Sequence, residues 1–458
     1  MRKLLLASAA MLGGTMVLAT GASAQNLATN VPASATAISS PGFSTATPAT
    51  SPMAASTMTV RLGGRLNFEM FAGGDSGRNA KGASQKLAPY TFAEYARLYP
   101  SFDAVAANGL RYGAALEIRQ DTGTSAGGGA AGSISGNAKN RGELYFRREM
   151  GYFGADKFGF LRFGATDQPT SLFATGTFEN FDMGGWNGDL EGWTNNTQPA
   201  WAFPDQGALY TTTKVVYVSP KFFNMVDFGV SFEPGTGNVG GGSQACGSGY
   251  DTTNYCDATS SSSISGENKR RRNTVDGVAR LRTAIGPVGL TATIGGMKSG
   301  KVLYNGTVAS TQQYNGLEVL DAGLQVTWGG LAVGGHVDYG EFNAGYNLSP
   351  KGGRKSLAYL AGASYSIGPA VFGVQAMDFQ NPGSWTQSSA SSVGRTRNEW
   401  GIGAGSTVTV APGAYVFLSY LYGHRHQAGV DILTGTNGAV THNNVQSQGV
   451  VLGTMLKW

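Results

Sequence analysis

Sixteen runs of this chain alternate apolar and polar side chains, and the links that join them are by turns short and long. From Val60 to Met70 every even position except Gly64 is apolar, whereas the odd positions through Glu69 are polar or Gly. Leu110 to Gln120 repeats the pattern. A period of two predicts β-strands with one apolar and one polar face. The runs begin near residues 59, 90, 109, 142, 157, 207, 221, 271, 288, 315, 331, 355, 370, 396, 414 and 446.

The links between these runs indicate the architecture. Short links lie near 106–109, 154–157, 219–221, 286–289, 328–330, 367–369 and 411–413, and long links occupy roughly 72–89, 121–141, 165–206, 234–270, 300–314, 341–354, 381–395 and 424–445. Transmembrane β-barrels have short periplasmic turns, long outer loops and an even number of strands, and about 9–11 residues cross the bilayer. The sequence therefore predicts an all-β fold, an antiparallel transmembrane barrel of about 16 strands.

Two other all-β architectures are alternatives. A soluble β-helix or propeller would show a fixed short repeat, which the chain lacks. A secreted array of β-sandwiches gives no reason for the alternation of short and long links. Composition suits many strands and turns, since 70 of the 458 residues are Gly and only 13 % are charged, against about 25 % in average proteins.

The N-terminus predicts export. A basic start, an apolar stretch to Ala19 and the small residues Ala22-Ser23-Ala24 indicate a signal peptide over residues 1–24. The alternative, a transmembrane anchor, needs about 20 apolar residues, and this stretch is short and interrupted by Gly. Residues 25–58, rich in Ala, Ser, Thr and Pro, are expected to form a flexible periplasmic tail, and the barrel is expected over 59–458. Losing the signal peptide lowers the formal net charge from +5 to +3, too little to indicate a nucleic-acid partner.

The last residues form a further alternating strand that ends on an aromatic. Val450, Leu452, Thr454, Leu456 and Trp458 share one face of it. A terminal aromatic preceded by alternating apolar residues resembles the signal that the barrel assembly machinery reads. We therefore assign Val450, Leu452, Leu456 and Trp458 to that signal.

Several segments together carry a family resemblance. They are Val60-Arg61-Leu62-Gly63-Gly64-Arg65, Ala96-Arg97-Leu98-Tyr99-Pro100, Asn108-Gly109-Leu110-Arg111-Tyr112-Gly113, Leu144-Tyr145-Phe146-Arg147-Arg148 and Phe160-Leu161-Arg162-Phe163-Gly164-Ala165-Thr166-Asp167. In order and spacing they resemble the general diffusion porins of Gram-negative bacteria, and above all those of alphaproteobacteria such as acetic acid bacteria. The resemblance covers about residues 58–458. The tail at 25–57 departs from compact porins.

The resemblance implies that the third long loop folds into the barrel and narrows it. This loop carries acidic residues and no Lys or Arg between Ala165 and Gln206, and basic residues occupy lumen-side positions of the early strands. Opposed acidic and basic surfaces would set up a transverse field that sorts ions. The alternative is that the acidic residues are solvated on an exposed loop. The expected constriction residues are Glu179, Asp182, Asp189 and Glu191 on the loop, and Arg61, Arg65, Arg97, Arg111, Arg119, Arg147 and Arg162 on the wall. Arg148 has the wrong parity unless a bulge intervenes.

The two cysteines, Cys246 and Cys256, lie in a Gly- and Ser-rich loop of an exported chain, so a disulfide between them is expected. No metal site, cofactor or catalytic constellation is expected. His424 and His426 lack an identifiable third ligand, and no nucleophile is accompanied by a plausible base.

We therefore expect an outer-membrane channel for passive diffusion of small hydrophilic solutes, in contact with lipid and lipopolysaccharide. The basic run at 269–272 could meet lipopolysaccharide phosphates or lie solvated at a loop end. The resemblance also implies a homotrimer. The alternatives are a channel selective for a sugar or an anion, and a structural or adhesive barrel with a plugged lumen.

Overall fold

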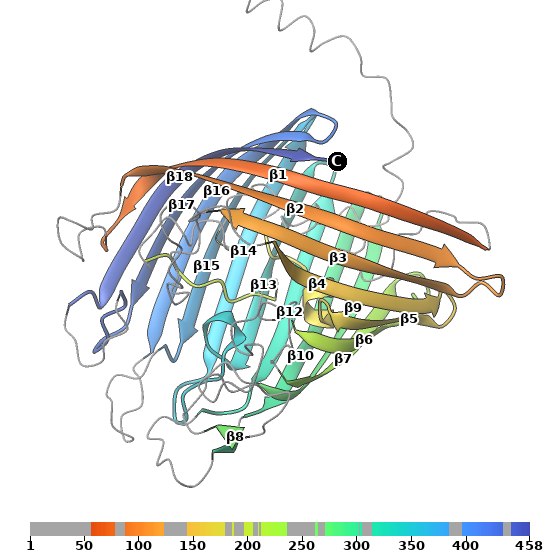
Figure 1. Ribbon diagram of the computed structural model, residues 1–458. Helices are drawn as coiled ribbons and strands as arrows, with labels where there is room; N and C mark the ends of the chain where they lie inside the picture. Colours follow the sequence, from red (N-terminus) through yellow and green to blue (C-terminus); the bar gives the residue numbers. More distant parts are fainter. Residues whose placement is uncertain are drawn as a thin grey trace, which may run out of the picture.

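The protein is a closed antiparallel β-barrel of sixteen strands in the computed structural model (Figure 1). The structure describes residues 56–77, 88–122, 144–178, 186, 197–204, 209, 212–235, 262–263, 271–301, 303–304, 314–383, 396–433 and 441–458. Each barrel strand pairs with its neighbours along the chain, and β1 closes the ring against β18. The expected fold class is therefore confirmed.

The barrel strands are β1 (Thr57–Asp75), β2 (Tyr90–Val105), β3 (Arg111–Thr122), β4 (Tyr145–Ala155), β5 (Gly159–Ala165), β6 (Thr213–Val218), β7 (Val226–Gly235), β9 (Arg272–Ile285), β10 (Val288–Gly300), β12 (Glu318–Trp328), β13 (Leu331–Glu341), β14 (Ser356–Ile367), β15 (Ala370–Asn381), β16 (Arg397–Ala411), β17 (Ala414–His426) and β18 (Asn444–Lys457). Two short parallel strands, β8 (Ser262–Ser263) and β11 (Leu303–Tyr304), form a separate sheet. The helical elements of the described part are α3 (Pro169–Phe173) and the 3-10 turn η4 (Ala344–Tyr346). None of the described helices is long and apolar enough to span a membrane.

Most strands begin within four residues of the positions that the alternation predicts. The clear exceptions are β6, which begins at Thr213 and not near 207, and β7, which begins at Val226 and not near 221. Before β6, the buried Leu209 and Thr212 belong to the returning end of the third long loop. Before β7, the backbone of Phe222 and Val226 closes a tight turn through hydrogen bonds in both directions. The returning loop therefore displaced the start of β6, and a local turn displaced the start of β7.

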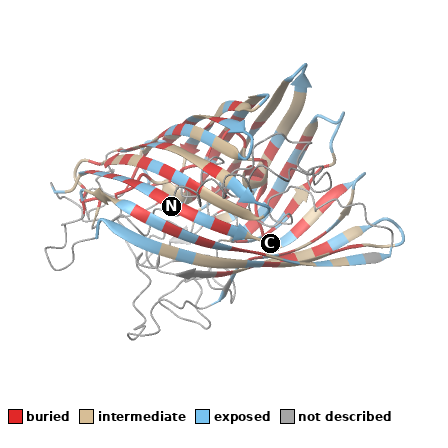
Figure 2. Ribbon diagram, turned by 90° about the horizontal axis from the view of Figure 1, so that it is seen from above, coloured by how far each residue is buried: buried red, intermediate tan, exposed pale blue. Residues whose placement is uncertain are grey.

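The two faces of the strands differ in burial as the period of two requires. Along β18 exposed and buried residues alternate over almost its whole length, and Figure 2 shows the same banding around the ring. The outward face of β1 carries Val60, Leu62, Leu66, Phe68 and Met70, all exposed, whereas the inward face holds polar residues. An apolar band facing outward with polar side chains inside is the arrangement of a barrel whose solvent on the outside is lipid.

Exposed aromatic side chains gather at both ends of this band. Near the short turns lie Phe158, Phe223, Trp328, Tyr365 and Trp458. Near the long loops lie Tyr90, Phe92, Phe146, Tyr339 and Tyr359. Aromatic girdles at both interfaces are typical of transmembrane barrels, because amphipathic rings favour the headgroup level.

Candidate functional site

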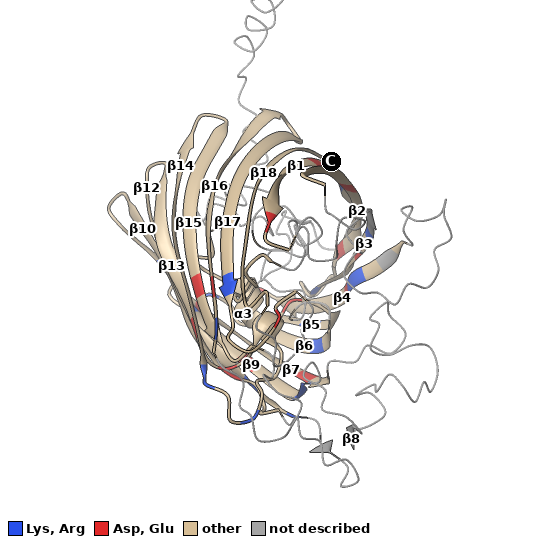
Figure 3. Cartoon of the chain, turned by 90° about the vertical axis from the view of Figure 1, so that its left-hand side faces the viewer, with Lys and Arg blue, Asp and Glu red and all other residues tan. Residues whose placement is uncertain are grey.

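The third long loop, between β5 and β6, runs along the inner surface of the barrel. The loop residues that the structure describes contact the inward faces of β7, β9, β12, β13, β14, β16 and β17 before the chain returns to β6. Figure 3 shows α3 inside the ring of strands. The β12 strand lies half-way around the ring from β2, so this part of the loop covers the side opposite the first strands.

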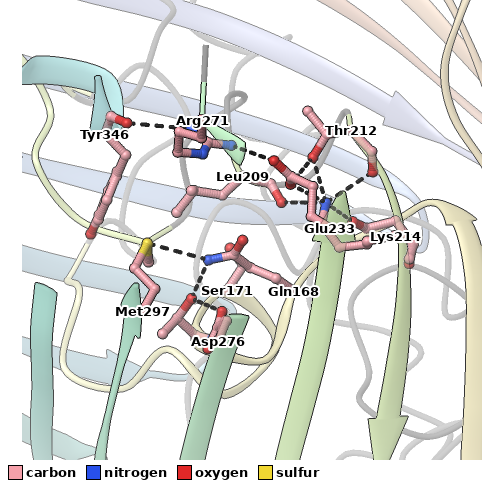
Figure 4. A network of polar contacts seen from close by, with 12 residues as sticks. Gln168, Ser171, Leu209, Thr212, Lys214, Glu233, Arg271, Asp276, Met297 and Tyr346 are labelled. Atoms are coloured by element: carbon pink, nitrogen blue, oxygen red, sulfur yellow. Dashed lines mark hydrogen bonds and ion pairs between the residues drawn. The ribbon is translucent and has the colours of Figure 1, made fainter. Parts of the chain in front are cut away.

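Both ends of the loop attach to one buried lysine, Lys214 on β6. Its Nζ donates hydrogen bonds to the carbonyl oxygens of Thr166 at the start of the loop and of Leu209 and Thr212 at its end, each at 2.9 Å. Nζ also lies 3.7 Å from Oε2 of Glu233, which in turn is 3.3 Å from Arg271 through its other oxygen. Figure 4 shows this network. Lys214 therefore ties the two ends of the loop together at the wall.

The helix α3 is fixed to the wall by a second polar contact. Oγ1 of Thr170 donates to Oδ2 of Asp276 on β9 at 2.7 Å, and the Thr170 amide donates to the same oxygen at 3.2 Å. Nε2 of Gln168 donates to Oγ1 of Thr170 at 2.7 Å, and Figure 4 shows Gln168 beside Asp276. The Arg280 guanidinium lies 4.1 Å above the ring of Phe173, which adds a cation–π contact.

Glycines on the inner wall make room for the loop farther along. On the loop itself, Gly176 has a φ of +77° and lies so close to the wall that a side chain there would overlap the carbonyl oxygen of Gly335. A side chain on Gly362 would overlap Phe178, and one on Gly423 would overlap Pro199 and Trp186. The loop therefore follows a track of inward-facing positions that have no side chain.

Arginines line the part of the wall opposite this track. Arg65 of β1 pairs directly with Arg97 of β2, which pairs in turn with Arg119 of β3. The guanidinium groups of Arg65 and Arg97 lie 5.2 and 4.3 Å from the centre of the Tyr95 ring, which contributes cation–π stabilisation between like charges. The structure thus brings three of the expected wall residues into one row across adjacent strands.

A β-bulge adds two arginines to this row. Glu117 pairs with Arg148, whereas the next residue, Ile118, pairs with Phe146, so Arg147 is the extra residue. Arg147 and Arg148 lie 3.6 and 3.3 Å from the Glu117 carboxylate, and Arg119 lies 2.6 Å from it. Glu117 is buried and joins the arginines of two strands. Sequence parity alone pointed Arg148 outward, and the bulge turns it inward.

Two of the other expected wall residues, Arg61 and Arg111, lie farther from this row. Arg61 forms an ion pair with Asp103, and Arg111 lies 3.3 Å from Asp156 in a short turn. Both therefore lie toward the end of the barrel that carries the short turns. Arg162 on β5 is buried in the wall.

The expected acidic residues Glu179, Asp182, Asp189 and Glu191 lie outside the described residues, as do Cys246 and Cys256. One acidic residue near the base of the loop is described. Burial raises the pKa of the Asp167 carboxyl, and the charges of Arg148 and Arg162 oppose that shift. Asp167 is 3.4 Å from Arg148 and so continues the polar row toward the loop.

Sequence reasoning missed Lys214 and Glu117 as organising residues. A lysine within the apolar segment Thr213–Val218 is a visible signal, because a charge at an inward position needs partners there. The identity of those partners, which are backbone oxygens of a distant loop, is not visible in the sequence.

Comparisons with known proteins agree with the barrel fold. A family model of Gram-negative porins matches residues 34–453. The chain belongs to the Gram-negative porin family. This porin is similar in fold to an anion-selective porin from Comamonas acidovorans, at 16 % identity and a TM-score of 0.53, over 88 % of this chain and 100 % of that one. A triple mutant of the Rhodopseudomonas blastica porin matches at 12 % identity and a TM-score of 0.48, over 87 % and 100 % of the two chains. No curated protein matches the sequence.

The porin is thus a multi-pass protein of the outer membrane that forms a channel for passive diffusion of small hydrophilic solutes. Family and fold are those of a channel, in agreement with the sequence analysis. Its apolar outer band contacts outer-membrane lipid, and solutes pass through the polar interior.

Proposed function

We propose that solutes pass between the arginine wall of β1–β4 and the third long loop, and that the charges of these two surfaces set the ion selectivity. The observation that carries this proposal is the row of Arg65, Arg97 and Arg119 opposite the track of the loop. On these strands the inward-facing arginines outnumber the inward-facing acidic side chains that the structure describes, so this wall has a net positive charge. The acidic side chains are Glu69, Asp75, Asp103 and Glu117.

The sequence of the third long loop supports an acidic surface opposite the arginine wall. Between Ala165 and Gln206 it contains only acidic charges, among them Glu179, Asp182, Asp189 and Glu191. In a water-filled passage with low-dielectric walls, such charges act strongly on small ions, and salt screens them over about 10 Å at 0.1 M. The porin is then a general diffusion channel in which the wall favours anions and the loop favours cations.

Reversal potentials under a salt gradient in planar bilayers test this proposal. Arg97→Gln with Arg119→Gln should shift permeability toward cations, and Glu179→Gln with Asp182→Asn should shift it toward anions. Both shifts should shrink as the salt concentration rises. Arg354→Gln, which changes an exposed arginine between β13 and β14, is the matched control and should have no effect. Unchanged reversal potentials in both double variants would refute the proposed constriction, and an absence of any conductance would favour a plugged structural barrel.

The exposed face of β18 supports the proposed assembly signal. Val450, Leu452, Leu456 and Trp458 all lie on the outer surface, with 40, 39, 52 and 61 % of their area exposed. An assembly factor that approaches from the lipid side would meet these side chains. We also propose the homotrimer that the sequence resemblance implies, which chemical cross-linking of the detergent-solubilised protein would test.

A further inference from the structure

Two buried carboxylates face each other on the inner wall, on the side opposite the arginine row. Asp321 of β12 pairs directly with Asp338 of β13, and the two residues have only 1 and 0 % of their area exposed. Like charges directly opposite each other destabilise a sheet. Buried carboxylates also require a paired cation or a metal ion.

One histidine lies beside this pair. Nδ1 of His336 is 2.8 Å from the carbonyl oxygen of Thr175 in the loop, and that oxygen is only an acceptor, so Nδ1 carries a proton and donates. Nε2 therefore faces the carboxylates, 2.7 Å from Oδ2 of Asp321 and 3.7 Å from Oδ1 of Asp338. A histidine that ligates a metal through one ring nitrogen commonly donates from the other to a backbone carbonyl.

The carboxylate oxygens are only partly used. The Tyr346 hydroxyl donates to Oδ2 of Asp338 at 2.7 Å. Oδ1 of Asp321 and Oδ1 of Asp338 accept no hydrogen bond from the described part of the chain, although both are buried. Two buried acceptor atoms without a described hydrogen-bond donor, beside a histidine nitrogen, indicate that a cation binds between them.

We propose that Asp321, His336 and Asp338 bind one divalent transition-metal ion, such as Zn²⁺. The charge balance supports a metal: two carboxylates with a protonated imidazole leave one uncompensated negative charge, whereas two carboxylates, a neutral imidazole and a divalent ion sum to zero. One potential ligand atom from each residue lies within 4.8 Å of the others. Ligand atoms around a tetrahedral Zn²⁺ lie about 3.3–3.5 Å apart, a value that the observed 2.7 and 3.7 Å bracket. Imidazole with carboxylates suits Zn²⁺ or Mn²⁺ better than Ca²⁺.

The site links the loop to the wall. His336 contacts the loop through Thr175, and the Phe203 ring meets the imidazole edge-on at 5.8 Å between centres. A metal on Nε2 would fix the imidazole in the orientation that holds the Thr175 carbonyl. The ion is therefore a structural one that holds the loop against β12 and β13.

The test is zinc binding by the full-length protein, folded in detergent and stripped with a chelator. After addition of Zn²⁺ and dialysis, elemental analysis should find one tightly held Zn²⁺ per chain in the wild type. Asp338→Asn, which preserves shape, and His336→Gln should each lose that ion. The double variant His424→Gln with His426→Gln is the matched control, because it removes another pair of histidines and should retain the ion. Far-UV circular dichroism verifies that each variant is a folded barrel.

X-ray absorption at the zinc edge of the wild type gives a result that needs no variant. The proposal expects one imidazole nitrogen among oxygen ligands at about 2.0–2.2 Å. The proposal would be overturned if the wild type retained no Zn²⁺. It would also be overturned if the double variant of His424 and His426 lost the Zn²⁺ that the wild type holds. In that case a proton shared within the cluster would have to compensate the two carboxylates.

Discussion

Replacing Lys214 with Met removes the contact that ties the two ends of the third loop to β6. Methionine nearly matches the length of the lysine stem and is apolar, so the wall keeps its packing while the charge and the donors disappear. Three backbone carbonyl oxygens, of Thr166, Leu209 and Thr212, lose their donor. Glu233 keeps Arg271 as a cationic neighbour, at 3.3 Å.

The expected free-energy cost of Lys214→Met follows from these lost contacts. Breaking a buried ion pair by removing one partner costs about 3–5 kcal/mol. Because Arg271 still compensates Glu233, the lower end applies, about 3 kcal/mol for the attachment of the loop ends. Since each 1.4 kcal/mol is tenfold, local opening of the loop base should become about 100-fold more frequent.

Native-state hydrogen exchange read by mass spectrometry measures this opening. Amides in 166–173, where the Leu172 amide donates to the carbonyl oxygen of Gln168, should exchange about 100-fold faster in Lys214→Met. Amides in 197–204 should change less, because Glu399 accepts a separate hydrogen bond from Ala200 at 2.7 Å. Lys355→Met, at an exposed position, is the control. A change of less than about threefold at 166–173 in a folded barrel would refute the role of Lys214.

Three further predictions concern the loop, the tail and the cysteines. Gly176→Ala should speed hydrogen exchange of residues 174–178 by more than tenfold, because the added side chain overlaps the wall and the backbone there is left-handed. Gly329→Ala is the control, since Gly329 is also left-handed but lies in open space and so reports the cost of backbone strain alone. If the two variants speed local exchange equally, packing against the wall is not the cause. Deleting residues 25–56, which precede β1, should leave membrane insertion and single-channel conductance unchanged, and loss of assembly would show that the tail belongs to the fold. Thiol labelling of the denatured, unreduced protein should detect neither Cys246 nor Cys256, whereas two labelled thiols would reject the disulfide.

The strand pattern was predictable because each strand meets two different solvents. Side chains that alternate between lipid and a polar interior leave a period of two in the sequence, as between Val60 and Met70. Closure of the ring leaves no strand edge exposed in the membrane, so strand number and link lengths followed from the same pattern. The arginines at Arg65, Arg97 and Arg119 were also visible, since their parity places them inside.

The contacts of the loop were not predictable, because they join residues far apart in the chain through backbone atoms. No local pattern shows that Lys214 donates to the carbonyl oxygens of Thr166 and Leu209, or that Gly176 packs against the carbonyl oxygen of Gly335. The bulge that brings Arg148 beside Glu117 changes the count of residues between strands and leaves no mark in the alternation.

The sequence by itself determined the ring of strands, its two faces and the basic character of the first four strands. The reason is that side chains facing lipid are apolar, whereas those facing the barrel interior are polar. Only the tertiary structure decided where the loop lies and which charges meet. Asp321 and Asp338 are 17 residues apart in the sequence and become neighbours through the register of β12 and β13. That register is fixed by hydrogen bonds and packing over both strands, which the identity of two aspartates does not reveal.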